Sequence, residues 1–96
     1  DFRIHGRKTK AFDWFSCNIE KNVDFLLLEG TTIGRVDKKF PTESEIEAEF
    51  IDTFKASNGI NLIYASGQNI DRLVSIYRAC KRTGKTLAID FYIANV

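Results

Sequence analysis

The sequence is poor in the residues that build metal and redox sites. Its 96 residues include one histidine, His5, and two cysteines, Cys17 and Cys80, which show no CxxC spacing. A single imidazole cannot supply the multi-histidine cage of a catalytic zinc, and no Ser-His-Asp arrangement stands out. We interpret the cysteines as free thiols in a reducing compartment, with Cys80 as a small residue of the core.

Long apolar runs and an excess of charge are also missing. No run approaches the roughly 18 residues of a membrane-spanning helix, and no signal peptide is recognisable. Fourteen Lys and Arg residues face thirteen Asp and Glu residues, which argues against a general electrostatic attraction to nucleic acid or membranes. The 44% apolar content is sufficient for one core. We expect a cytoplasmic chain without membrane contact.

The residues after Pro41 predict a helix over 42–57. Thr42 and Glu45 form a capping-box pattern, in which each side chain bonds the backbone amide of the other residue. Asn58-Gly59 is expected to stop the helix in a left-handed conformation. The apolar stripe at helical spacing consists of Ile46, Phe50, Ile51 and Phe54.

A second helix is predicted over 68–83, and Gly84 is expected to end it. Basic residues gather near its C-terminus, where they complement the negative end of the helix dipole. The expected buried stripe consists of Ile70, Leu73, Val74, Tyr77 and Cys80.

Three apolar runs around these helices are typical of buried strands: 24–29, 60–65 and 86–91. The order strand, helix, strand, helix, strand predicts an α/β fold, because such connections are right-handed and give parallel neighbouring strands. We therefore expect a βαβαβ parallel three-layer unit over 24–96. Residues 1–23 are expected to be irregular or to form short strands.

Two positions in this fold are candidates for chemistry. Glu29 ends the first predicted strand, and ligands of open α/β sheets bind outside the carboxyl ends of the strands. The turn that contains Ser66 and Asn69 precedes the second helix, and its amides are suited to a phosphate, with Arg72 one turn further on. The alternatives are a solvated structural carboxylate for Glu29 and an ordinary N-cap for the turn.

The basic residues near the N-terminus allow two interpretations as well. They could contact phosphates, or they could belong to a solvated surface strand or loop. They are Arg3, His5, Arg7, Lys8 and Lys10.

The order of these segments resembles a known family, the metallo-β-lactamase-fold hydrolases. The motifs that carry the resemblance are Asp1-Phe2-Arg3, His5-Gly6-Arg7-Lys8, Leu26-Leu27-Leu28-Glu29-Gly30-Thr31, Ser66-Gly67-Gln68-Asn69, Gly84-Lys85-Thr86-Leu87 and Asp90-Phe91-Tyr92-Ile93-Ala94. The later motifs resemble the opening of the inserted β-CASP domain of the nuclease branch, which includes ribonuclease J. The chain lacks the His-x-His-x-Asp-His segment that starts the metal cage of that family.

The resemblance implies a fragment: 1–40 would be the end of a hydrolase half-domain and 41–96 the first half of a β-CASP-like domain. It implies that Asp1 bridges two zinc ions and that Glu29 supports catalysis. It also implies that Ser66, Asn69 and Arg72 hold the phosphate of a nucleic acid, RNA above all.

Two functions are therefore expected from the sequence. In the first, the chain is an inactive piece of a two-zinc hydrolase that cleaves RNA or DNA phosphodiesters. In the second, it is an independent α/β module that binds a small anion or a protein partner.

Overall fold

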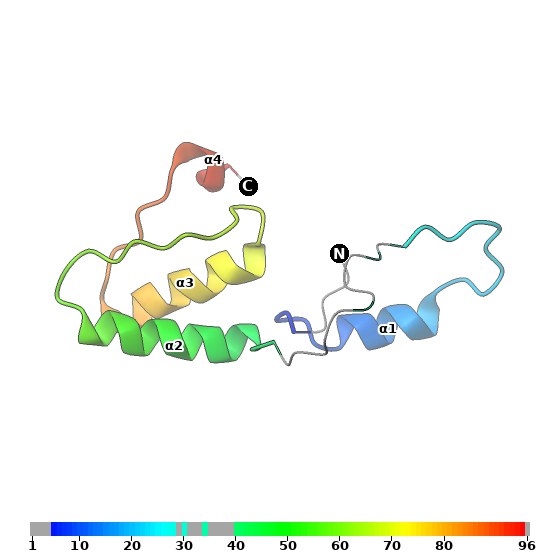
Figure 1. Ribbon diagram of the computed structural model, residues 1–96, viewed down its shortest axis with the longest axis horizontal. Coiled ribbons are helices and arrows are strands. Elements are labelled where there is room, and N and C mark those ends of the chain that lie inside the picture. The colour runs from blue at the N-terminus through cyan, green and yellow to red at the C-terminus, as the bar shows by residue number, and fades with distance from the viewer. Residues whose placement is uncertain (1–4, 29, 31–33, 35–39, 96) are drawn as a thin grey trace.

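The computed structural model describes residues 5–28, 30, 34 and 40–95, and its regular structure in these ranges is helical (Figure 1). The helices are α1 (Ala11–Asn18), α2 (Glu43–Ala56), α3 (Ile70–Thr83) and α4 (Phe91–Ala94). No strand occurs in the described ranges, so the predicted α/β fold with a parallel sheet is wrong.

The prediction of α2 is confirmed to within a residue at each end. Thr42 is the N-cap, its hydroxyl accepts the Glu45 amide at 3.3 Å, and the Glu45 carboxylate accepts the Thr42 amide at 2.6 Å. The end of the helix differs from the prediction. Ser57, not a left-handed glycine, is the C-cap, and its extended backbone leads the chain out of the helix.

The prediction of α3 is also confirmed, although it starts two residues later than expected. Asn69 caps it by accepting the Arg72 amide at 3.3 Å. Gly84 ends it at a φ of 70°, in the left-handed region that a residue without Cβ enters at no steric cost.

The segments predicted as the second and third strands run extended along α3 but do not pair. Within residues 60–65 the less exposed positions alternate with fully exposed Ile60, Leu62 and Tyr64, as expected for one face of a strand. The backbone groups of 60–65 and 86–89 make no hydrogen bond with any described residue. A strand requires such a ladder, so these segments are extended chain, and α4 replaces the end of the third predicted strand.

The core lies between α2 and α3, the two helices that pack together extensively in the described part of the chain. Its buried apolar residues are Phe54, Ile76, Ala79 and Cys80. Phe50 stacks on Phe54, with ring centroids 5.7 Å apart. The stripe predicted for α3 is wrong in part, because Tyr77 is 56% exposed and Ile70 is exposed as well.

The helix α1 lies away from this helical pair (Figure 1). The helix α1 buries none of its residues. The radius of gyration is 17.1 Å, against about 12.5 Å for a compact chain of this length. No helix in the described ranges has the length and apolar character that crossing a membrane requires.

Candidate functional site

A network of charged groups around two buried carboxylates holds α2, α3 and residues 5–7 together. Glu43, in the first turn of α2, accepts hydrogen bonds from Arg72 Nε at 3.2 and 3.3 Å and from Arg72 Nη2 at 3.1 Å. The hydroxyl of Ser75, which is fully buried, donates to Glu43 Oε2 at 2.7 Å. The carboxylate of Glu43 is thus satisfied by groups of α3, as a buried charge requires.

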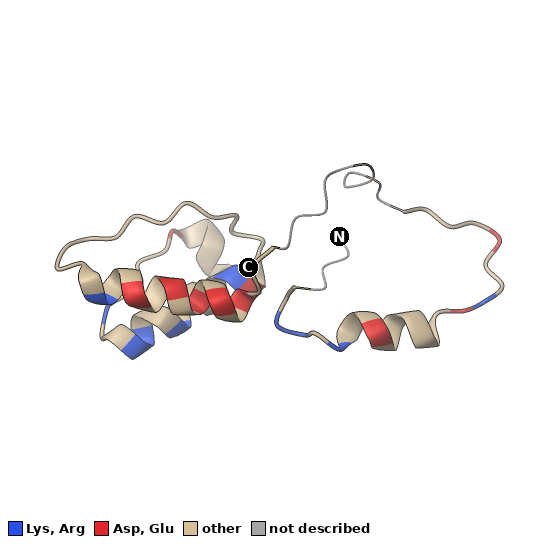
Figure 2. Ribbon diagram, turned by 60° about the horizontal axis from the view of Figure 1, so that its bottom comes forward, with Lys and Arg blue, Asp and Glu red and all other residues tan. Residues whose placement is uncertain are grey.

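The second buried carboxylate, Glu47, lies one turn further along α2 and binds two arginines. Arg7 Nη2 donates to Glu47 Oε2 and, at 2.9 Å, to the Ser75 hydroxyl. Arg82 Nη1 lies 2.8 Å from Glu47 Oε1, in an ion pair without hydrogen-bond alignment. Among the charged residues that Figure 2 colours on the two helices, Arg72 and Arg82 of α3 thus pair with Glu43 and Glu47 of α2.

Residues 5–7 are attached to the helical pair by backbone contacts as well. The Glu43 amide donates to the His5 carbonyl at 3.2 Å, and the Arg7 amide donates to Asp71 Oδ2 at 3.2 Å. A Cβ at Gly6 would lie 2.7 Å from Asp71 Oδ2, so a larger residue at this position would displace the Asp71 carboxylate. In this network the carboxylates of Glu43, Glu47 and Asp71 balance the three guanidinium groups of Arg7, Arg72 and Arg82.

The pKa of the Glu43 carboxyl reflects this environment. Burial raises this pKa. The hydrogen bonds from Arg72 and Ser75 and the charges of Arg72 and Arg7 together lower it by more, so the pKa lies below its ordinary value of 4.5. Burial also raises the pKa of the Cys80 thiol, against a smaller opposing effect of Lys85, which suits a core residue rather than a nucleophile.

A carboxyl whose pKa is lowered by folding stabilises the fold above its unfolded pKa, and the stability is lost as pH falls through the folded pKa. We therefore expect the free energy of unfolding to decrease as the pH drops below about 4.5, and Glu43→Gln to reduce that decrease. Urea unfolding followed by circular dichroism at several pH values between 3 and 7 measures this. An equal acid dependence in the wild type and in Glu43→Gln would contradict the assignment.

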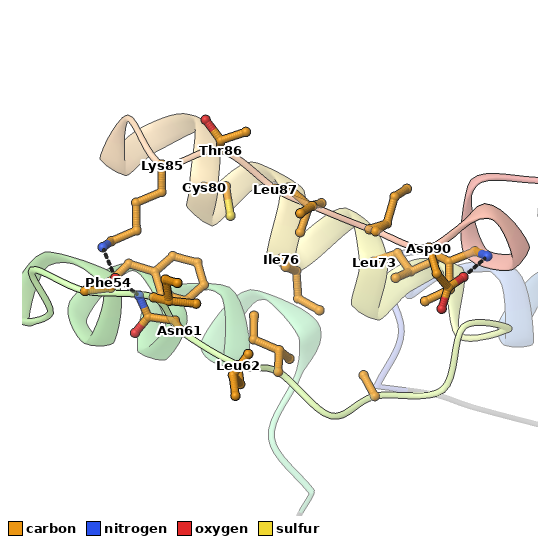
Figure 3. Close-up of a pocket in the computed structure, with 17 residues that line it drawn as sticks. Phe54, Asn61, Leu62, Leu73, Ile76, Cys80, Lys85, Thr86, Leu87 and Asp90 are labelled. Carbon is orange, nitrogen blue, oxygen red and sulfur yellow. Dashed lines mark hydrogen bonds between the residues drawn. The ribbon is translucent and has the colours of Figure 1, made fainter.

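An apolar cleft lies on the other side of the helical pair, between the extended segments 60–65 and 85–90 (Figure 3). Its volume is about 650 Å³. The helices contribute Phe54, Leu73, Ile76 and Cys80, and the two segments and α4 contribute Ile60, Leu62, Ile63, Ala65, Leu87, Ala88, Ile89 and Ile93. Lys85 lies at one end of the cleft and Asp90 at the other (Figure 3).

The charged residues of the cleft differ in their environments. The Lys85 ammonium donates to the carbonyls of Ser57 at 2.8 Å and Gly59 at 3.3 Å, and no carboxylate among the described residues pairs with it. The Asp90 carboxylate accepts the amide of Ile93 at 2.8 Å and caps α4. The cleft therefore has one positive end without a neutralising partner.

The structure brings the residues predicted to bind phosphate into one region but gives them other partners. The Ser66 carbonyl accepts the Asn69 amide at 3.1 Å, and Asn69 is the N-cap of α3. Arg72 forms its ion pair with Glu43. The turn also contacts α4, since a Cβ at Gly67 would lie 2.9 Å from Ile93 Cγ1. Phosphate binding at this turn stays a prediction.

The other predicted site residues, Asp1 and Glu29, lie outside the described residues. Their proposed roles in metal binding and catalysis also stay predictions, as does the division of the chain at residue 40. Among the residues that are described, no group of three or more His, Cys, Asp and Glu side chains is placed to hold a metal ion.

The sequence analysis missed the buried carboxylates of Glu43 and Glu47, because it assigned only apolar residues to the buried face of this helix. A signal was present: Glu43 and Glu47 are four residues apart and therefore share a helix face. On the second helix Arg72 and Ser75 are three residues apart and also share a face, and their guanidinium and hydroxyl groups can donate hydrogen bonds to a carboxylate.

No protein-family model, no curated protein and no solved structure matches this chain. Together with the lack of a sheet and of a metal-ligand group in the described residues, this overturns the resemblance to metallo-β-lactamase-fold nucleases. Nothing in the described residues supports the hydrolase assignment that followed from this resemblance.

Proposed function

We propose that the chain is a protein-interaction module whose apolar cleft binds an extended peptide segment of a partner. The observation that carries this proposal is the combination of an apolar floor with two flanking segments, 60–65 and 86–89, whose backbone groups lack hydrogen-bond partners among the described residues. Such segments resemble the unpaired edge strand of a sheet, and the backbone of a bound peptide can form hydrogen bonds with their amides and carbonyls.

The chemistry of the cleft defines the kind of segment that it binds. Its floor is formed by large apolar side chains, so every second residue of the bound peptide should be apolar. Main-chain hydrogen bonds to the flanking segments supply affinity, and the apolar side chains supply specificity. Lys85 at one end of the cleft favours an acidic residue next to the apolar stretch.

Binding of a defined peptide tests the proposal. A fluorescein-labelled pentapeptide in which leucine alternates with threonine should bind saturably in fluorescence anisotropy. The same peptide with alternate amides N-methylated should bind at least about tenfold more weakly, because it loses the hydrogen bonds of one edge.

Variants of the cleft provide the second part of this test. Leu87→Lys and Ala88→Lys place a charge in the cleft and should each weaken peptide binding at least about tenfold. Ala88 is exposed, so its variant leaves the core intact. Tyr77→Lys on α3 lies outside the cleft and should bind like the wild type. Equal binding by all variants, or unchanged binding of the methylated peptide, would refute the proposal.

We also propose a reducing, cytoplasmic location. It is supported by two free cysteines, of which Cys17 is exposed and Cys80 is buried.

Metal-dependent cleavage of nucleic acid stays a prediction from the sequence. The described residues do not fit a zinc site, since His5 is their single histidine and no ligand group forms around it. No catalytic step is derived from them. The zinc affinity of the chain should be measured by calorimetry and compared with that of Asp1→Ala. Affinity that is lost in the variant would show a zinc site outside the described residues.

A further inference from the structure

The described chain exposes a second apolar element that lacks a partner. Residues 25–28, a phenylalanine followed by three leucines, are between 61% and 97% exposed. No described residue makes a hydrogen bond to their backbone. Four consecutive apolar side chains in water are unfavourable and typical of a binding segment rather than of an ordinary surface.

The segment and the cleft match in length, and in charge at the Lys85 end of the cleft. The segment 25–28 has four residues, as many as the flanking segment 86–89, and with its flanking acids Asp24 and Glu29 it has six, as many as 60–65. An acid at each end means that either orientation brings a carboxylate to Lys85, the ammonium group without a carboxylate partner. At the opposite end Asp90 is held by the amide of Ile93, as the N-cap of α4.

We infer that the occupant of the cleft is residues 25–28 of a second copy of this chain. The inference rests on the proposed function and names its partner. Each copy carries one cleft and one segment, so reciprocal insertion uses both and closes a dimer with two-fold symmetry. The inserted backbone gains partners on both sides, and the apolar side chains of the segment leave water.

Analytical ultracentrifugation over a range of concentrations tests the dimer. The wild-type chain should sediment as a dimer that dissociates on dilution. The double variant Leu27→Asp/Leu28→Asp places a charge on both faces of the segment and should raise the dissociation constant at least about tenfold. Both residues are exposed, so the helical pair should remain folded in circular dichroism.

Complementation gives a sharper result. Ala88→Lys blocks the cleft but keeps the core and the segment, whereas Leu27→Asp/Leu28→Asp blocks the segment but keeps the cleft. Each variant alone should be monomeric, and an equimolar mixture should form a heterodimer with one intact insertion. A monomeric wild type, a dimer that persists in both variants, or a mixture that stays monomeric would overturn the inference.

Failure of this inference can be separated from failure of the proposed function. The alternating leucine peptide is titrated into Leu27→Asp/Leu28→Asp, whose cleft cannot be filled by its own segment. Peptide binding with a monomeric wild type would show that the cleft binds a strand of another protein. Absence of both binding and dimerisation would overturn the two proposals together.

Discussion

Phe54→Ala should destabilise the chain by about 3 to 5 kcal/mol, the usual cost of truncating a buried phenylalanine. Phe54 is 3% exposed and stacks on Phe50 in the same helix. It packs in a core with three other buried apolar residues, Ile76, Ala79 and Cys80. The cavity would remove much of the contact between α2 and α3. Since small domains are typically stable by only about 5 to 15 kcal/mol, we expect a large loss of helix at room temperature.

Thermal and urea unfolding by circular dichroism measure this effect. The matched control is Phe91→Ala, because Phe91 is 96% exposed at the start of α4 and should change the free energy of unfolding by less than about 0.5 kcal/mol. Similar losses for the two variants would show that the core is not centred on the contact between α2 and α3.

The two long helices could be predicted from the sequence because their signals are local. The capping box of Thr42 and Glu45 and the left-handed stop at Gly84 each involve residues within one helical turn. Such signals act through neighbouring backbone groups and do not depend on the rest of the fold. The end of α2 was predicted less well, since Asn58-Gly59 permits a left-handed turn but does not impose one.

The prediction of a parallel sheet was wrong because strand pairing is a long-range property that the sequence of one segment does not determine. The apolar runs 60–65 and 86–91 were predicted to be buried strands, and neither forms a strand, although exposure alternates along the first of them. An apolar run does not specify which segment completes its hydrogen bonds. In this structure no described segment does so, and an apolar cleft lies between the two.

The buried network could not be found from hydrophobic periodicity, which assigns charged residues to water. Glu43 and Glu47 are buried because their partners lie on α3 and, in the case of Arg7, 40 residues earlier in the chain. The pairing of carboxylates with guanidinium groups makes this burial tolerable, and the spacing of the two acids on their helix does not show which arginines they pair with.

Glu47→Ala should have the second large effect on stability, because it leaves the guanidinium of Arg7 without its carboxylate. The side chain of Arg7 is only 16% exposed, so it cannot simply turn to water, whereas Arg82 is 61% exposed and can. Breaking a buried ion pair by removing one partner costs about 3 to 5 kcal/mol. We expect a value near 3 kcal/mol, since Arg7 keeps the Ser75 hydroxyl as an acceptor.

The effect of Glu47→Ala should also be local. Amide hydrogen exchange should show reduced protection at Arg7, whose amide donates to Asp71, while α1 is unchanged because it buries no residue. Glu49→Ala, an exposed acid on the same helix, is the matched control and should change stability by less than about 0.5 kcal/mol.

A double-mutant cycle isolates the pair. If Arg7→Ala and Glu47→Ala are coupled through their ion pair, the double variant should be more stable than the sum of the single losses predicts, because neither charge is then left unpaired. Additive losses, or equal effects of Glu47→Ala and Glu49→Ala, would mean that residues 5–7 are not anchored to the helical pair through this carboxylate. The anchoring matters for the proposed module, since it fixes where the chain that leads to residues 25–28 leaves the helical pair.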